Sequence, residues 1–547
     1  MVFRLTKALI FLLVTCPQLF PQGVRGLVVD KQNGVPVLGA FVTLIDEYSY
    51  QRAAALTDST GRFFLRAPKP GSYVLRAERI GYETITSAPL QLTRDTIFIR
   101  FEVPTVAIPI DSIDVRGADR GCRKRADASG VYQLWNALST ALRITAWSQE
   151  SDSMQYSLFR YMRDIERTTG LLMAENRIFH TKTSALSFSS LAPEELEAGF
   201  LQADASERTL WGPDALLLLS NEFQDMHCFS LVRDRKANAI GMSFEPLKNS
   251  KDVVDVKGVL WADARNAELR RLTFEYTNLP RHLAVVGSSG EVEFRKLPSG
   301  HWIVQKWWIR MPLFGGRNTS RGYFYLYLLG TREEGGHVVS VDGVPSHPMT
   351  AGVIEGQVVD SATQQPISDA TVFVSTTPHE AKTDSLGRYR ITGLSPGKHQ
   401  IAVNTPTLVE LNLPIQLHER TVSPQRPVQL NLTSPTYASM YRSLCAAEDP
   451  DVGGSLIFGI VRDSASGVPL YDAEMKAQWE GASLNNEAIS KRWRTRQTRT
   501  DGRYYLCWMP ENSDVEVTAR SRRNLARANV HLMGAAKLRQ DFMIPRR

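Results

Sequence analysis

The hydrophobic residues of this chain alternate with polar residues over many short runs, and a period of two is typical of β-strands with one buried face. Turn residues separate the runs. Short strands divided by turns predict β-sandwiches, in which two sheets bury their apolar faces against each other. In the first such region the residues expected to face inward are Val28, Val42, Phe63, Leu65, Tyr73 and Leu75.

One set of landmarks recurs three times at unequal intervals, which indicates copies of a domain and not a solenoid. Each copy has a Gly that opens an apolar strand ending in Asp, then a Pro, then a second strand that follows Ala, and finally a turn of the type Thr-Asp-x-x-Gly-Arg-aromatic. The third copy diverges, because Asp501 directly precedes its Gly and a longer insert separates its strands. The copies open at Gly26, Gly356 and Gly459.

The turn of each copy has a structural interpretation. Its Asp can accept hydrogen bonds from backbone amides of its own turn, and its Gly supplies a positive φ. A calcium site is the alternative, but one carboxylate per turn falls far short of the roughly six to eight oxygen ligands that calcium takes. The residues expected in these turns are Asp58, Gly61, Asp384, Gly387, Asp501 and Gly502.

In these landmarks the chain resembles the carboxypeptidase regulatory-like domain family. The resemblance implies a transthyretin-like, seven-stranded Greek-key sandwich, a fold also grouped with carbohydrate-binding-like folds. It further implies a location outside the cytoplasm, and it supplies no catalytic site. It covers residues 24–103, 353–434 and 456–547, which is under half of the chain.

The region between the first two copies, residues 122–350, has a different pattern. Apolar residues follow helical spacing between Ser129 and Thr145, and alternating strands come after them. We therefore predict a mostly β protein in which three transthyretin-like Greek-key β-sandwich modules flank a central α+β domain with a large antiparallel curved sheet. Residues 104–121 and 435–455 are the expected linkers.

The run from Gly258 to Asp263, with Leu269 to Leu272 after it, is similar to strands of the LolA-like family of periplasmic lipoprotein-binding half-barrels. That resemblance implies an apolar concavity for an acyl chain or a peptide. The alternative, which we favour, is that the aromatic residues there form an ordinary core. The aromatic residues that would line such a concavity are Trp261, Phe274, Tyr276, Trp302 and Trp307.

The first residues predict export. Arg4 and Lys7 precede an apolar run from Ala8 to Val14, which has the length of a signal-peptide core and is too short to span a bilayer. We expect residues 1–23 to be removed. The tetrapeptide that ends at Cys16 also resembles a bacterial lipoprotein box, so membrane association through a lipid on Cys16 is the minority interpretation.

Four cysteines remain once Cys16 is removed, an even number in a chain expected to enter an oxidising compartment. Two disulfides are therefore predicted. The pairing that stays within domains joins Cys122 to Cys228 and Cys445 to Cys507.

Composition narrows the classes of function. With 547 residues the chain is long enough for about four domains, and 43% hydrophobic with 22% charged residues is ordinary globular usage. The net charge of +7 is scattered over short basic runs. Nucleic-acid binding needs a clustered basic face, so we exclude that class of partner.

Enzyme signatures are missing from the sequence. None of the 10 histidines has Glu three residues on, which argues against the zinc carboxypeptidases to which such modules are attached. The neighbours Glu194-Glu195 and Glu333-Glu334 are interpreted as surface charge, and the adjacent pair His227-Cys228 cannot form a hydrogen-bonded nucleophile. We expect no catalytic residue, no cofactor and no metal.

The sequence thus favours an exported, non-enzymatic binding or scaffold protein of the bacterial cell envelope, periplasmic or associated with the outer membrane or cell surface. Its ligand would be an unknown protein, glycan or lipid. One alternative is a lipid or lipopeptide carrier that uses the central sheet. Another is carbohydrate binding through exposed aromatic residues of the third copy, for which the candidates are Trp479, Trp493 and Trp508.

Overall fold

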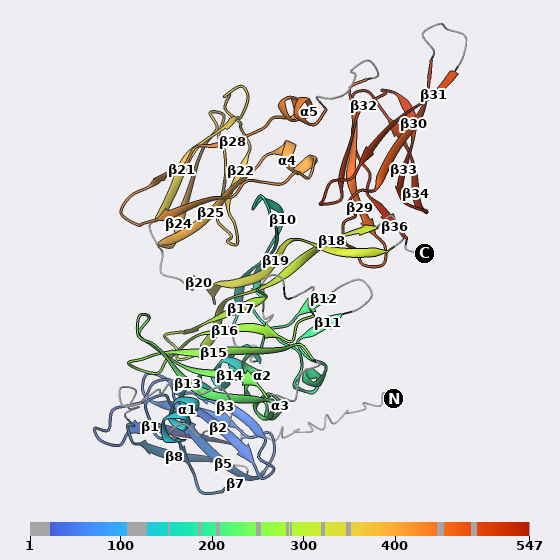
Figure 1. The fold of residues 1–547 in the computed structure, drawn as a ribbon. Coiled ribbons are helices and arrows are strands. Elements are labelled where there is room, and N and C mark those ends of the chain that lie inside the picture. The colour runs from blue at the N-terminus through green and yellow to red at the C-terminus, as the bar shows by residue number, and fades with distance from the viewer. Residues whose placement is uncertain are drawn as a thin grey trace, which may run out of the picture.

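The computed structural model contains three small sandwiches and one large sheet (Figure 1). It describes residues 22–93, 95–106, 128–150, 154–183, 187–203, 208–247, 253–280, 284, 287–318, 323–345, 352–445, 453–482 and 489–545. Cys16, Cys122, the expected signal core and most of the first expected linker lie outside these residues. We name four units: the first module (22–106), the central domain (128–345), the second module (352–445) and the third module (453–545).

The first module is built from two facing sheets. One sheet has the strand order β4-β1-β8, and the other has the order β3-β2-β5-β6 with β7 also on β5. Strands β1 and β8 run parallel, whereas the remaining pairs are antiparallel. The strands are β1 (Gly23–Asp30), β2 (Phe41–Asp46), β3 (Gln51–Leu56), β4 (Arg62–Arg66), β5 (Gly71–Glu78), β6 (Ile85–Thr86), β7 (Leu90–Leu92) and β8 (Thr96–Val103).

The second module repeats this topology, with the orders β24-β21-β27 and β23-β22-β25-β26, and β28 also on β21. Two short helices follow its strands, and α5 forms within the stretch expected to be a linker. The elements are β21 (Gly352–Asp360), β22 (Thr371–Val374), β23 (Glu380–Lys382), β24 (Arg388–Leu394), β25 (Gly397–Asn404), α4 (Pro406–Glu410), β26 (His418–Val422), β27 (Val428–Gln429), β28 (Leu432–Ser434) and α5 (Tyr437–Cys445).

The third module has the same arrangement again, with the orders β32-β29-β35 and β31-β30-β33-β34, and β36 also on β29. Its strands are longer, because the insert extends the hairpin of β30 and β31. The strands are β29 (Ser455–Asp463), β30 (Glu474–Ala482), β31 (Ile489–Gln497), β32 (Arg503–Met509), β33 (Ser513–Ser521), β34 (Asn524–Leu532), β35 (Lys537–Arg539) and β36 (Phe542–Ile544).

The Gly that opens each copy is required by a close backbone approach. A Cβ added to Gly26 would lie 2.3 Å from the carbonyl oxygen of Ile99 on the parallel strand β8. At Gly356 and Gly459 the corresponding distances to a carbonyl oxygen are 2.0 and 2.1 Å. A distance of this size excludes any side chain, so the landmark marks where the first strand passes its parallel neighbour.

The Thr of each turn fastens two loops of its module. The hydroxyl of Thr57 donates to the carbonyl of Val37 and accepts from the amide of Ala40 at 2.8 Å. Thr383 and Thr498 form the same two bonds in their own modules. A buried backbone amide and carbonyl are thereby satisfied by one side chain, which explains why this residue type recurs.

The central domain is a ten-stranded antiparallel sheet with the order β10-β9-β19-β18-β17-β16-β15-β14-β13, to which β20 adds on β19. A small β11-β12 pair, three α-helices and a 3-10 helix accompany it among the described residues. The elements are α1 (Ala128–Glu150), β9 (Tyr156–Glu166), β10 (Leu172–Thr183), a 3-10 helix (Pro193–Ala198), β11 (Leu201–Ala203), β12 (Arg208–Leu210), α2 (Ala215–Leu219), α3 (Asn221–Met226), β13 (His227–Asp234), β14 (Ala239–Pro246), β15 (Asp255–Asp263), β16 (Leu269–Thr277), β17 (Ser289–Lys296), β18 (Trp302–Asn318), β19 (Phe324–Val341) and β20 (Val344–Pro345).

Helix α1 packs its apolar side on one face of this sheet. Leu134, Leu138 and Leu142 are fully buried in one cluster with sheet residues such as Leu272 and Phe274. The helix runs to Glu150, beyond the predicted range, because its last turns contact the first module. Among the described residues, no helix is long and apolar enough to cross a membrane.

The four units form one connected body (Figure 1). The first module lies at one end of the central domain, and the second and third modules lie beside each other at the opposite end. The long hairpins β9–β10 and β18–β19 extend from the central sheet toward these two modules. The contacts at the hairpin ends therefore determine how the modules are held.

Candidate functional site

A row of charged side chains crosses four neighbouring strands of the central sheet. In register, Arg310 of β18 faces Glu333 of β19, Glu333 faces Arg163 of β9, and Arg163 faces Glu175 of β10. Arg310 Nη2 lies 2.7 Å and Arg163 Nη2 lies 2.9 Å from the two carboxylate oxygens of Glu333. Opposite charges directly across strands attract, so the row stabilises this part of the sheet.

Glu333 is at the centre of this charged row and is only 5% exposed. Burial alone would raise the pKa of its carboxyl, but the positive charges of Arg163 and Arg310 outweigh burial and lower the pKa below its ordinary value. The hydroxyl of Tyr161 donates to the same carboxylate at 3.1 Å. Burial and the nearby Glu333 charge raise the pKa of Tyr161, so this hydroxyl stays a donor.

The second module covers the charged row. Arg163 Nη1 donates to Ser375 Oγ at 3.0 Å and to Gln400 Oε1 at 2.7 Å. The Ser375 hydroxyl in turn donates to Glu175 at 2.6 Å, and the amide of Thr376 donates to the other oxygen of that carboxylate at 2.9 Å. Burial of a charged side chain is costly unless other groups pair with it or form hydrogen bonds to it. Here the central domain and the second module both supply such groups.

Backbone hydrogen bonds also join the central domain to the second module. Leu172 of β10 and Ile415 exchange their amide hydrogens with each other's carbonyls, both at 2.8 Å. Beside this bridge, Leu172 packs with Phe373 and Ala402 of the second module in a small apolar cluster. The interface thus combines a β-bridge, an apolar contact and buried ion pairs.

The tip of the β18–β19 hairpin is attached to the third module. The amide of Gly316 donates to Pro469 at 2.8 Å, and its carbonyl accepts from the amide of Tyr471 at 3.0 Å. Arg317 forms an ion pair with Asp472 at 2.8 Å. The third module also reaches the β9–β10 hairpin, because Arg503 Nη2 donates to the carbonyl of Met173.

The first module is attached at the other end of the sheet through α1. The ring of Phe41 lies 5.5 Å from the ring of Trp147, and Arg143 pairs with the buried Glu78 at 2.7 Å. The backbones of the first module and the central domain approach so closely that a Cβ on Gly300 would lie 2.8 Å from the Cα of Gly39. All three modules therefore contact the central domain through buried groups.

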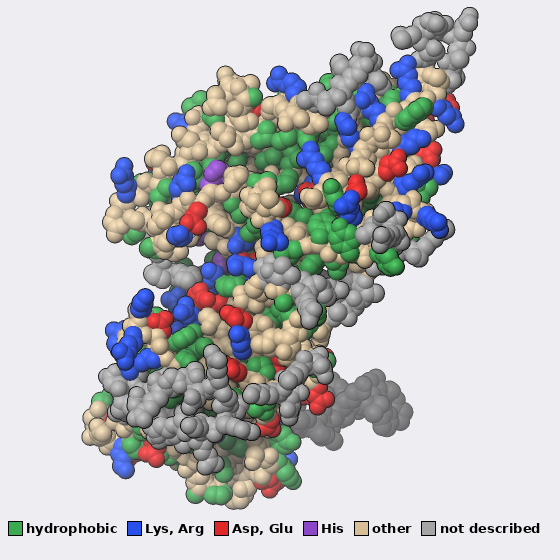
Figure 2. Space-filling model, viewed as in Figure 1, with side chains coloured by type: hydrophobic (Ala, Val, Ile, Leu, Met, Phe, Trp, Pro, Cys, Tyr) green, Lys and Arg blue, Asp and Glu red, His purple; other side chains and the backbone are tan. Residues whose placement is uncertain are grey.

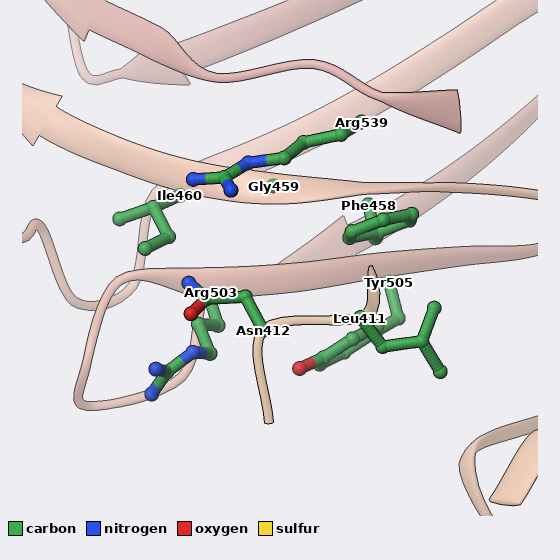
Figure 3. A pocket seen from close by; sticks show the side chains of 8 residues that line it. All are labelled: Leu411, Asn412, Phe458, Gly459, Ile460, Arg503, Tyr505 and Arg539. Carbon is green, nitrogen blue, oxygen red and sulfur yellow. The ribbon is translucent and has the colours of Figure 1, made fainter. Parts of the chain in front are cut away.

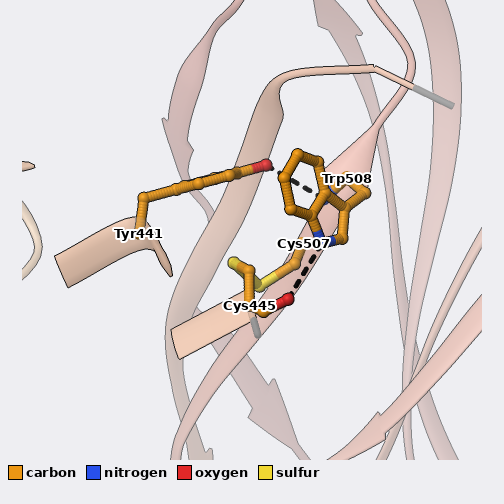
Figure 4. The surroundings of a disulfide bond; sticks show 4 residues. All are labelled: Tyr441, Cys445, Cys507 and Trp508. Atoms are coloured by element: carbon orange, nitrogen blue, oxygen red, sulfur yellow. Dashed lines mark hydrogen bonds between the residues drawn. A yellow bond between two sulfur atoms is a disulfide. The ribbon is translucent and has the colours of Figure 1, made fainter. Parts of the chain in front are cut away.

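A disulfide between Cys445 and Cys507 attaches α5 to the third module (Figure 4). It is the bond predicted for this pair. Next to it, Trp508 has a φ of +53°, which is rare for a bulky residue. Its amide donates to the Tyr441 hydroxyl at 3.2 Å and its Nε1 donates to the Cys445 carbonyl at 3.0 Å, and these bonds hold the unusual conformation. Cys228 is also disulfide-bonded, whereas Cys122 lies outside the described residues, so the pairing of these two cysteines stays a prediction.

Four of the five aromatic residues that could line a concavity lie in or against the core of the central domain, whereas Trp261 lies between the buried Leu260 and Ala262 and faces the other side of the sheet. Phe274, Tyr276 and Trp302 are 2%, 8% and 2% exposed in the cluster that includes α1. Trp261 and Trp307 are half-buried, and their indole Nε1 groups donate to Thr273 at 3.1 Å and to Ser187 at 2.7 Å. Their neighbours are protein groups, and a role in ligand binding stays a prediction.

The turn residues are arranged as their structural interpretation requires. Asp58 accepts from the amides of Thr60 and Arg62, and Asp384 accepts from the amides of Leu386 and Arg388. Gly61, Gly387 and Gly502 have φ values of 73°, 71° and 75°. In the third module the shifted Asp501 accepts from the amide of Arg503, and Arg499 occupies the backbone position of Asp58.

Two of the side chains with potentially catalytic groups, Glu333 and His227, lie in the interior. The interpretation of Glu333 as surface charge is wrong, because the hairpin strands and the second module enclose it. His227 is 4% exposed, with Nδ1 2.9 Å from the Phe223 carbonyl and Nε2 3.2 Å from Asp255. Both ring nitrogens are therefore engaged within the protein. Within the described part of the chain, no three His, Cys, Asp or Glu side chains gather as metal ligands.

The three tryptophans considered for carbohydrate binding differ in exposure. Trp479 is only 5% exposed in the core of the third module, and Trp508 is half-buried beside the disulfide, so neither is the exposed ring that was expected. Trp493 on β31 is 63% exposed, with Lys476 Nζ 5.7 Å from its ring centroid. On the face of the third module drawn in Figure 2, Lys and Arg side chains lie among fewer Asp and Glu side chains.

These features define a class of multidomain β-sandwich proteins in which repeats are fixed to a central sheet. Residues 23–100 and 353–433 match the family model described as carboxypeptidase regulatory-like domain. The chain therefore contains two domains of this family. The third module shares their topology but lies outside the matched residues. No curated protein matches the chain.

Solved structures with local similarity include 5-hydroxyisourate hydrolase of Klebsiella pneumoniae, at 18% identity over 16% of this chain and 92% of that chain, with a TM-score of 0.14. The Bacillus anthracis TIE protein is 10% identical over 72% of this chain and 52% of its own, with a TM-score of 0.15. A streptococcal ancillary pilin is 11% identical over 48% and 81%, with a TM-score of 0.15. This chain thus spans about half the length of the TIE protein.

Sequence patterns did not reveal the charged row. Arg163, Glu175, Arg310 and Glu333 are separated by long stretches and become neighbours only through strand register. A local signal exists at Arg310, whose strand neighbours Ile309 and Met311 are apolar and buried, because a charge in such a strand requires a partner.

Proposed function

We propose that this protein is an exported, non-enzymatic scaffold and binding protein of the bacterial cell envelope. In this role the central sheet holds three sandwich modules at fixed positions, so that their outer faces are presented to partners. The observation that carries the proposal is the attachment of every module by buried contacts, above all the charged row under the second module. Modules linked as flexible beads would not need such interfaces.

Export is supported by the chemistry of the cysteines. Cys445 and Cys507 form a disulfide, and Cys228 is also oxidised. Disulfides persist in oxidising compartments and are rare in the cytosol. The basic residues and the apolar run at the N-terminus have the pattern of a signal peptide, which would direct the chain to such a compartment.

The intact mass of the non-reduced protein, purified from the envelope fraction of an expressing cell, tests this proposal. We expect a chain shortened near residue 23 whose remaining cysteines carry no free thiol. A chain that begins at Cys16 and carries the added mass of a lipid would still support export, and would show that the protein is anchored to a membrane through Cys16. A full-length chain with free thiols, recovered from the cytosol, would contradict the proposal.

A second candidate function, carbohydrate binding, is favoured by Trp493. Its exposed ring offers a flat apolar face of the kind on which a sugar ring stacks, and Gln478 faces it on the neighbouring strand. We expect a Trp493→Ala variant to lose any signal that the intact chain gives on a glycan array. Tyr132→Ala, which removes another exposed aromatic ring on α1, is the matched control. Silence of the intact chain across the array would reject this candidate.

A further inference from the structure

The outer face of the three-stranded sheet in the first module has two exposed aromatic rings. Phe64 of β4 and Phe98 of β8 are both register partners of Arg25 on β1, which lies between them. Phe64 is 48% and Phe98 is 58% exposed, and Arg25 is exposed as well. A single exposed Phe needs no explanation, but two in one row around an arginine form a defined surface. We call this set of residues the Phe-Arg-Phe row.

The second module has a polar row at the same register positions. Glu355 is the partner of Arg390 on β24 and of Gln429 on β27. Its carboxylate forms an ion pair with Arg390 and accepts from Gln429 Nε2 at 2.6 Å. This row satisfies its own polar groups, so the second module needs no partner on this face.

The third module has an aromatic row at these positions, and there the row is covered. Phe458 is the partner of Tyr505 and of Arg539, and the two rings are only 3% and 7% exposed. Leu408, Leu411 and Leu413 of the second module bury them together with Tyr441. Figure 3 shows the turn of Leu411 and Asn412 lying across these strands, with Arg503 and Arg539 beside it.

The molecule therefore contains one example of what covers an aromatic row of this type: a short chain segment that presents leucines. The corresponding row of the first module has the same aromatic character and remains exposed. We propose that the Phe-Arg-Phe row binds an acidic, leucine-bearing polypeptide segment of another protein. This inference rests on the proposed scaffold role, because it names the kind of partner that one presented face takes.

The positive charge of this face indicates that its partner is acidic. Arg62 and Arg66 on β4 are exposed on the same face, on either side of Phe64. Among the described residues, Arg25 and Arg66 form no ion pair, whereas Arg100 on β8 pairs with Glu102 at 3.2 Å. A second copy of this chain would place arginines against arginines, which is unfavourable. A segment with carboxylates complements the face and retains the leucine contact.

The test uses the full chain and a fluorescent synthetic peptide of residues 405–417 that carries Thr407→Glu and Asn412→Glu. This probe keeps the leucines that cover the third module and adds the acidic groups that the arginines require. We expect saturable binding by fluorescence anisotropy, weakened by added salt because exposed charges are screened. The double variant Phe64→Ser/Phe98→Ser should weaken binding by about tenfold or more, as removal of interface anchors does.

Two controls make the result specific. Arg25→Glu changes one exposed side chain without touching the core and should also weaken binding about tenfold, since it reverses the central charge. Arg390→Ser/Gln429→Ser makes the matched change on the second module and should leave binding within about twofold, because that row satisfies itself.

Absence of saturable binding, or binding that the Phe64 and Phe98 changes do not alter, would overturn the inference. Binding to phosphatidylglycerol vesicles in place of the peptide, lost on the same substitutions, would also overturn it and assign the face to a membrane surface. The proposed function fails independently, through the intact mass described above, so the two failures can be told apart.

Discussion

Replacement of Arg163 by Ala removes the side chain that connects the charged row to the second module. Arg163 Nη2 lies 2.9 Å from Glu333, and its Nη1 donates to Ser375 and Gln400. The Arg163 and Glu333 side chains are 10% and 7% exposed, so water cannot replace these contacts without opening the interface. Glu333 would retain only Arg310 and Tyr161 as partners.

Removal of one partner from a buried ion pair typically costs about 3–5 kcal/mol. Because Arg310 still offsets part of the Glu333 charge, we expect a cost near the lower end, about 3 kcal/mol. This corresponds to about a hundredfold increase in the population in which the interface is open. The exposed ion pair of Arg390 with Glu355 is the matched comparison, and its loss should cost about 0–1 kcal/mol.

Hydrogen exchange reports this opening without assuming that the whole chain unfolds in one step. The amides of Leu172 and Ile415 are the relevant probes, because they bond only across the interface. In Arg163→Ala they should exchange about a hundredfold faster than in the unchanged chain, whereas Arg390→Ala should leave them unaltered. Acceleration below about threefold would refute the role assigned to Arg163.

Three further predictions concern other contacts of the fold. The pKa of Glu333 is lowered in the folded chain, so its contribution to stability is present above its unfolded pKa of about 4.5 and is lost as the pH falls through the lower folded value. In Glu333→Gln, the unfolding midpoint should therefore depend less on pH in that acid range. Joint replacement of Cys445 and Cys507 by Ser should destabilise the attachment of α5 by about 2–4 kcal/mol in chemical unfolding, and an unchanged midpoint would count against it. Gly356→Ala should cost about 1–3 kcal/mol or prevent folding of the second module, whereas Gly287→Ala, where a Cβ meets nothing within 4 Å, should be neutral in the same thermal scan.

Local patterns were enough to predict the modules. The landmark residues act within their own module: the turn Asp bonds amides two to four residues further on, and the Gly and Thr contact a strand and a loop of the same module. The alternation around Phe274 and Tyr276 also identified strands and their buried face, because period two is a property of the strand itself. Signals of this kind can be read from a single sequence.

Relations between modules could not be predicted in the same way. Glu333 was misinterpreted because adjacent carboxylates resemble a surface run, and only the register of β9, β18 and β19 surrounds it with arginines. The expectation that Trp479 is exposed is wrong, because the insert lengthens β30 and Trp479 faces the core. Both errors involve contacts made by residues distant in sequence, which no local pattern encodes.

The central claim is that the three modules are held in fixed positions on the central sheet. Small-angle X-ray scattering of the full chain measures this arrangement directly in solution. We predict a profile that the single arrangement in Figure 1 reproduces, with a radius of gyration that does not change with salt. A profile that requires an ensemble of separated modules would contradict the account.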